Sequence, residues 1–259
     1  MNNSAIEFFK NNFKDSILLS EKKIDFDNVL LEVESLPRGW YELSRLNKED
    51  RINFSRDYVL KNLPYIPHIY SFVFNFFDSL DDVDVILTKN NDEEFYTPQI
   101  VYSKKKSDVF FRGFIPADEE LIDQIDMHFN NMLPFDFVSF LKIHNGFCKN
   151  DDTGIFKIED FDSVYDNFLK IVESKDSSIK LGSKFIDPNS LIPFYQCYNK
   201  DEFQCFNIEW FPKNQTANVY YTGSDNSISD YLTNFSWHEN FAFETFLDWL
   251  IFYLDVESL

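Results

Sequence analysis

The chain has 259 residues, of which 44 are acidic and 24 are basic, so its formal net charge is −20. An acidic chain lacks the Lys/Arg-rich surface that nucleic-acid phosphates and anionic membranes require, which argues against direct binding to either. Aromatic residues make up 19% of the chain, with 31 Phe and only 6 Gly. This composition excludes a disordered chain, and a protein of this size buries roughly 70–75% of its unfolded surface without needing disulfides or metals.

The first 115 residues combine helical and strand patterns. We expect a short helix around residues 6–13, continued by residues 17–19, while residues 29–31 could be a strand. Two clearer helices follow, one from the N-cap Asn47 to Leu63 and one from Pro67 to Leu80 with an apolar stripe of period 3.6. The pattern then changes to three strands joined by short polar turns, at residues 83–88, 97–103 and 109–114. Such a succession predicts an antiparallel meander.

After Pro116, the clearest element is a buried helix between Pro134 and Gly146. Proline suits the first helical position, and Asn145-Gly146 provides a stop because glycine tolerates the left-handed conformation. Phe137, Val138 and Leu141 form its apolar face, with His144 extending the same stripe.

The other elements expected in this half are three helices and a set of short strands. The helices are predicted at residues 118–132, 161–172 and 240–254, and the strands at 155–158, 179–181, 185–186, 191–198, 203–210 and 217–221. Polar turns separate them, including an acidic turn at 150–154 and a second one at 199–202.

Motifs for catalysis are absent from the sequence. The glycine positions exclude the Gly-rich phosphate loops and the Gly-x-Ser-x-Gly nucleophile elbow. His238-Glu239 begins like a zinc-protease motif but lacks the second histidine, and no calcium loop fits around Gly154. His144 as a general base and Cys148 as a nucleophile are both weaker interpretations than a core-edge imidazole and an inert thiol. We therefore predict no catalytic residue, no cofactor and no metal.

The three cysteines are Cys148, Cys197 and Cys205. An odd number without a Cys-x-x-Cys pair or a secretory signal predicts reduced thiols in a cytoplasmic protein. No apolar run approaches the 18 or so residues of a membrane span. Aromatic residues near the end of the chain could mark a binding surface or pack in the core, namely Trp210, Tyr220, Tyr221 and Trp237.

Three segments resemble the SMI1/KNR4 family of the SUKH superfamily. The first is the helix with Leu133-Pro134, Phe137, Phe140-Leu141 and Asn145-Gly146. The second is Leu191-Ile192-Pro193-Phe194, followed by Asp201-Glu202 and Cys205-Phe206-Asn207, and the third is the closing helix from Phe243 to Leu250. The resemblance covers residues 116–259, whereas residues 1–115 match no family known to us. We predict two domains with a boundary between these ranges.

The resemblance implies an α+β fold, an antiparallel β-sheet flanked by helices, with an α+β N-terminal extension packed against it. It also implies a non-enzymatic protein-binding module, and many bacterial members are immunity proteins that neutralise toxins, often nucleases. The net charge fits a basic partner. The alternatives are a regulatory or host-directed interaction protein of the same fold, and a hydrolase. The predicted partner-binding residues are the carboxylates of the two acidic turns, Asp151, Asp152, Asp201 and Glu202.

Overall fold

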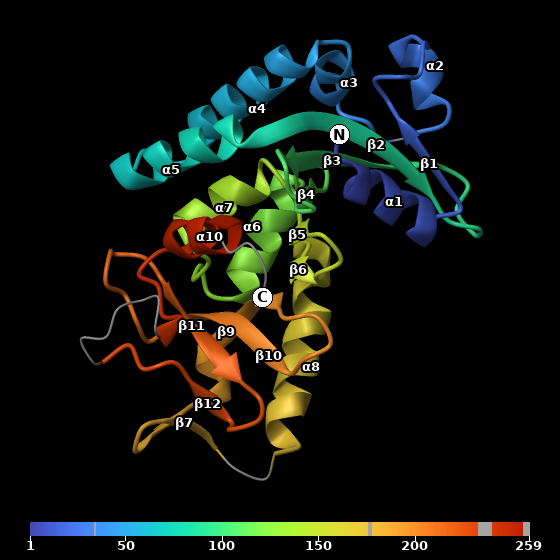
Figure 1. The fold of residues 1–259 in the computed structure, drawn as a ribbon. Coiled ribbons are helices and arrows are strands. Elements are labelled where there is room, and N and C mark those ends of the chain that lie inside the picture. Colours follow the sequence, from blue (N-terminus) through green and yellow to red (C-terminus); the bar gives the residue numbers. More distant parts are fainter. Residues whose placement is uncertain (34, 176–177, 233–239, 256–259) are drawn as a thin grey trace. The chain divides into compact units, whose positions relative to one another are not determined.

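The computed structural model describes residues 1–33, 35–175, 178–232 and 240–255, which form two compact units (Figure 1). The first unit comprises Met1–Pro116 and Ile143–Asp151, and the second comprises Ala117–Lys142 and Asp152–Leu259. Both contain helices and mainly antiparallel strands, which confirms the α+β class.

The first unit contains an antiparallel sheet in the order β1-β2-β3-β4-β5. Its strands are β1 (Asp15–Leu18), β2 (Leu80–Lys89), β3 (Thr97–Lys104), β4 (Phe110–Gly113) and β5 (Phe147–Lys149). Its helices are α1 (Asn3–Asn12), α2 (Phe26–Leu30), α3 (Arg38–Ser44), α4 (Lys48–Asn62) and α5 (Pro67–Asp78). The predicted meander and the two predicted helices α4 and α5 are confirmed, with Asn47 capping α4 through its side chain.

Helices cover both faces of this sheet. Tyr102 and Phe111 are cross-strand partners on one face, where the ring of Phe77 from α5 lies 5.9 Å from Tyr102. On the other face, Val101 and Phe110 pack in a buried cluster with Phe9 of α1. Because side chains alternate along a strand, β2, which is buried along nearly its whole length, supplies both of these cores.

Two predictions in the first unit are wrong. Residues 17–19 do not continue the first helix, because residues 15–18 form β1 and pair with the edge of β2. Residues 29–31 are not a strand, since Asp25 accepts a hydrogen bond from the Asn28 amide and caps helix α2.

The second unit contains a sheet in the order β6-β9-β10-β11-β12-β7-β8, antiparallel except for the β12–β7 pair. The strands are β6 (Gly154–Ile155), β7 (Ile179–Leu181), β8 (Lys184–Ile186), β9 (Leu191–Gln196), β10 (Glu202–Asn207), β11 (Ala217–Thr222) and β12 (Ser227–Ile228). The helices are α6 (Glu119–His128), α7 (Phe135–Leu141), α8 (Phe161–Glu173) and α10 (Phe246–Asp255), with 3-10 turns η1 (Ile158–Asp160) and η2 (Pro188–Ser190).

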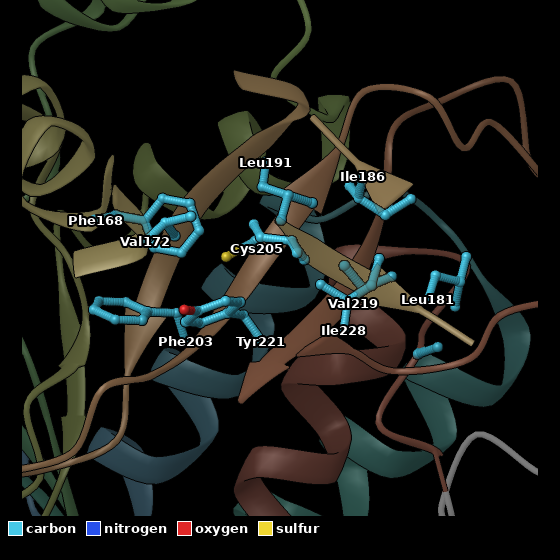
Figure 2. Packing of buried hydrophobic residues seen from close by; sticks show 12 residues of the cluster. Phe168, Val172, Leu181, Ile186, Leu191, Phe203, Cys205, Val219, Tyr221 and Ile228 are labelled. Atoms are coloured by element: carbon cyan, nitrogen blue, oxygen red, sulfur yellow. The ribbon is translucent and has the colours of Figure 1, made fainter. Parts of the chain in front are cut away.

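One core of this unit lies between α8 and the sheet. Figure 2 shows Phe168 and Val172 of α8 beside Phe203, Cys205 and Tyr221 of the central strands. The Phe168 ring lies 5.4 Å from Phe203 and 5.1 Å from Tyr221, in edge-on contacts that aromatic pairs favour.

A second core lies between the sheet and helices α7 and α10. Phe137 of α7 lies 5.0 Å from Phe206 of β10 and 5.0 Å from Phe246 of α10. The buried carboxylate of Asp136 accepts the amide of Leu247, so the first turn of α7 holds the first turn of α10. The predicted buried helix is therefore part of this core.

Several predicted boundaries in this unit are wrong. Helix α7 ends at Leu141 rather than at Asn145-Gly146, because the Asn145 amide donates to the carbonyl of Ile115 instead of continuing the helix. Helix α6 ends at His128, and Asn130 and Asn131 take left-handed conformations. The closing helix begins at residue 246 instead of 240, because Thr245 and Asp248 form a capping pair and Phe243 makes a β-bridge with Asn218.

Candidate functional site

A row of polar side chains crosses the three central strands of the second unit. Gln204 of β10 lies opposite Tyr195 of β9 and opposite Tyr220 of β11, so all three project from one face of the sheet. Cys197 follows Tyr195 by two residues and shares its side. The ladder shifts between Gln204 and Cys205, and this bulge sets both Phe194 and Tyr195 against the ring of Trp249, at 4.9 and 5.2 Å.

Helix α10 and Phe241 enclose this row and leave a cavity of about 110 Å³. Its walls are mainly aromatic, and the lining residues are Tyr195, Cys197, Lys200, Gln204, Tyr220, Phe241, Trp249, Phe252 and Tyr253. We refer to it as the aromatic pocket. The volume is below the roughly 150 Å³ of a cavity that accepts benzene, so it suits one small chemical group.

Two carboxylates orient the phenol groups of the aromatic pocket. Asp152 Oδ2 accepts hydrogen bonds from the hydroxyls of Tyr195, at 2.9 Å, and Tyr253, at 3.0 Å. Glu202 Oε2 accepts one from the hydroxyl of Tyr220, at 2.7 Å. Because each phenol donates its only proton to a carboxylate, the phenol oxygens have only lone pairs left to offer to other groups.

The thiol of Cys197 lies between these phenols. Its sulfur is 3.7 Å from the Tyr195 hydroxyl and 3.6 Å from the Tyr220 hydroxyl. Burial raises the pKa of Tyr195, and the nearby Asp152 carboxylate raises it further. Burial likewise raises the pKa of Tyr220, reinforced by its hydrogen bond to Glu202, so both phenols are neutral at physiological pH.

The wall at Phe241 is strained. Phe241 has a φ of 55°, a left-handed conformation that is rare for a bulky residue and costs on the order of 1–3 kcal/mol. Its carbonyl accepts a hydrogen bond from the side-chain amide of Gln204 at 3.0 Å, and the same amide donates to Asn218 Oδ1 at 2.6 Å. The side-chain amide of Gln204, in the middle of the row, therefore fixes the backbone of Phe241 and with it the position of this ring.

The four predicted partner-binding carboxylates occupy different settings. Asp152 and Glu202 are half-buried and serve the aromatic pocket through its tyrosines. Asp201 precedes Glu202 and is exposed; its carboxylate pairs with Lys175 at 3.3 Å, and its carbonyl accepts the Gly223 amide. Asp151 is exposed and belongs to the first unit.

The two residues weighed as catalysts are buried in the first unit. The His144 ring contacts the Tyr102 hydroxyl at 2.9 Å, and burial lowers the pKa of His144 to about 4, partly opposed by a hydrogen bond that the imidazole donates to the backbone of Phe114. Cys148 is 4% exposed, and its thiol donates weakly to the Arg112 carbonyl. Neither is accessible to a substrate.

The aromatic candidates divide between surface and core. Tyr220 lines the aromatic pocket, Tyr221 is fully buried in the core beside α8, and Trp210 stacks on Tyr231 at 4.6 Å. Trp237 and His238 lie outside the described residues. Sequence reasoning missed Tyr195, Cys197, Trp249 and Tyr253, although the alternation of Tyr195 and Cys197 along a strand was a readable signal.

Among residues 1–33, 35–175, 178–232 and 240–255, no three His, Cys, Asp or Glu side chains gather as metal ligands would. None of the helices found there is long and apolar enough to span a bilayer.

The second unit is an α+β fold whose mainly antiparallel sheet has helices on both faces. The protein-family model described as SMI1 / KNR4 family (SUKH-1) matches residues 116–251, which is more than half of the chain. The chain therefore belongs to the SMI1/KNR4 family. A search of curated proteins found no significant match.

The acidity of the chain is concentrated in the part that matches the family. Residues 116–259 contain 25 Asp and Glu against nine Lys and no Arg, which gives −16 of the total −20. Residues 1–115 are nearly balanced, with 19 acidic and 15 basic residues. A strong negative field around one domain favours basic partners and speeds their encounter.

Proposed function

We propose that this protein is a cytoplasmic, non-enzymatic binding module that acts as an immunity protein and neutralises a basic toxin. Membership of the SMI1/KNR4 family supports a protein partner. The observation that carries the proposal is the charge of −16 on residues 116–259, which contain no arginine. A nuclease toxin must present a basic surface to its phosphate substrate, and an acidic inhibitor is attracted to such a surface.

Carboxylates at or near the surface of the second unit supply most of the contacts in this proposal. Glu202 accepts the hydroxyl of Tyr220 in the aromatic pocket and Asp201 precedes it in an exposed position, while the exposed Asp162 and Asp166 lie one turn apart on α8. Two exposed carboxylates one turn apart add to the negative field that a basic partner would meet. Asp151 and Asp152 in the other acidic turn are also proposed as contacts.

Co-expression with the product of the neighbouring gene tests the proposal. We expect growth protection and a complex whose association rate falls at least tenfold between 50 and 300 mM NaCl. Exchange of Asp201 to Asn together with Glu202 to Gln should weaken the complex, whereas neutralising the exposed Glu7 and Glu21 in residues 1–115 should not. The immunity function would be contradicted if no toxin encoded nearby formed a complex with the protein and the protein gave no protection against any of them.

A second candidate is a regulatory or host-directed binding protein of the same fold without a toxin partner. The observation that favours it is the segment of 115 residues that precedes the matched range. In both cases we propose that residues 1–115 form a separate N-terminal region and that residues 116–259 carry the binding function. Cross-linking with recovery from lysate distinguishes the two, because an immunity protein should yield one toxin while a regulator should yield resident cellular proteins.

A further inference from the structure

We propose that the aromatic pocket of the second unit is a binding site for one positively charged group, the head of a lysine or arginine side chain of the bound protein. The source of this cation rests on the proposed function, whereas the chemistry of the pocket stands on its own residues.

The walls of the pocket are built for a cation. Six of its lining residues carry aromatic rings, contributed by β9, β11, α10 and Phe241. The faces of aromatic rings are electron-rich and attract a cation within about 6 Å, most strongly when it is desolvated. Trp249 and Tyr253 stack at 5.2 Å, and Tyr195 lies 5.2 Å from one and 5.4 Å from the other, so this side of the pocket is rigid.

The polar groups at the pocket also favour a cation over an anion or a neutral group. Asp152 and Glu202 take the hydroxyl protons of the three tyrosines, so the phenol oxygens can only accept from a ligand. An anion would meet these lone pairs and two carboxylates, and it would be repelled. A neutral apolar group would leave the lone pairs unsatisfied.

In the free protein, Lys200 partly compensates the negative charge of Asp152 and Glu202. Its ammonium lies 3.5 Å from Glu202 and its side chain is 64% exposed, so it places an exposed cation at the pocket. An incoming cation would compete with Lys200 for Glu202. Removing the Lys200 charge should therefore strengthen binding, which neither an anion site nor a purely apolar hole would do.

Alkylation of Cys197 by N-ethylmaleimide in the intact full-length chain provides the measurement. Cys148 and Cys205 are buried and Cys197 is half-buried in the pocket, so we expect one rapid modification, absent in Cys197→Ser. Tetramethylammonium chloride and Nα-acetyl-arginine amide should slow it, compared with sodium chloride at equal ionic strength and with neutral tert-butanol. Equal rates in all solutions, or equal protection by tert-butanol, would overturn the cation site.

Two variants sharpen the test. Phe252→Leu removes one ring and should weaken protection by tetramethylammonium about fivefold, while Lys200→Met should strengthen it roughly fivefold. If Phe252→Leu does not fold, the exposed Lys200 carries the test alone. Protection by sulfate that is lost in Lys200→Met would identify an anion site and refute the proposal.

The source of the cation is decided with the toxin complex. If the toxin inserts a basic side chain, its complex should block alkylation of Cys197, and Phe252→Leu should raise the Kd. A toxin that binds without protecting Cys197 would refute the assigned source while leaving the immunity function intact. Protection by tetramethylammonium without any toxin partner would support the pocket and contradict the immunity function.

Discussion

The imidazole of His144 lies directly against the backbone of Gly113. A Cβ atom placed on Gly113 would lie 2.5 Å from His144 Nδ1 and 2.8 Å from two ring carbons, closer than carbon atoms pack. The ring is fixed on its other sides by Trp40, Tyr102 and Phe147. The core of the first unit therefore requires glycine in β4.

Gly113→Ala should destabilise the protein by about 1–3 kcal/mol, because the buried ring cannot move away without strain in its neighbours. Urea unfolding measures the loss. Gly39→Ala is the matched control, since no atom lies within 4 Å of the new methyl group and the position is inside α3. There, alanine should raise stability by roughly 0.5–1 kcal/mol. Equal effects at both positions would contradict the close packing at Gly113.

His144 should also make stability depend on pH. Burial lowers the pKa of His144 to about 4 from 6.5, so the unfolded chain binds a proton more readily than the folded chain between these values. This contribution is complete above pH 6.5 and is lost as the pH falls toward 4, up to about 3 kcal/mol. The stability difference between the wild type and His144→Gln should shift against the wild type over that range, as measured by urea unfolding at several pH values.

Asp136 should act in the opposite direction. Burial raises the pKa of Asp136 to about 6 from 3.8, despite hydrogen bonds from the Leu247 and Phe137 amides. The folded chain then binds the proton more tightly, so this contribution is present below pH 3.8 and is lost as the pH rises toward 6. Relative to Asp136→Asn, the wild type should gain up to about 3 kcal/mol between pH 7 and pH 4. A pH-independent difference would refute this assignment.

A buried ion pair joins α4 to β2. Arg51 Nη2 lies 2.7 Å from Asp82 Oδ1 and 3.6 Å from Asp84 Oδ2, and all three side chains are at most 8% exposed. Arg51→Met would leave the buried Asp82 with the N-terminal ammonium at 2.8 Å and the buried Asp84 with the Ser20 hydroxyl as partners, at a cost of about 3 kcal/mol. Arg38→Met is the control, because its pair with Glu42 is exposed and should cost at most about 1 kcal/mol. Thermal unfolding of both variants measures the contrast.

The hydrogen bonds from the Tyr195 and Tyr253 hydroxyls to Asp152 should stabilise the aromatic pocket. Asp152→Ala removes the acceptor of the hydroxyls of Tyr195 and Tyr253, two buried residues, and should cost about 2–3 kcal/mol. The exposed Asp151→Ala should change stability by less than about 0.5 kcal/mol. Cys197 should also be alkylated faster in Asp152→Ala than in Asp151→Ala, since its phenol neighbours lose their orientation. Unchanged alkylation would indicate that Asp152 does not order the pocket.

Local sequence determined the helices with strong periodicity and clear caps. Helix α4 begins after Asn47 and α5 begins at Pro67 as expected, because capping and the proline φ angle depend on neighbouring residues alone. The family resemblance and the net acidity of the whole chain were likewise evident from residue order and composition.

Tertiary structure decided the elements whose backbone partners lie far away in the chain. Residues 15–18 are a strand because β2 offers an open edge about 70 residues later, and α7 stops at Leu141 because the Asn145 amide pairs with Ile115. The aromatic pocket depends still more on long-range pairing, since the register of three strands aligns Tyr195, Gln204 and Tyr220 before α10 covers them. That strand register cannot be predicted from one sequence by local patterns, because hydrogen bonds and packing between distant segments set it.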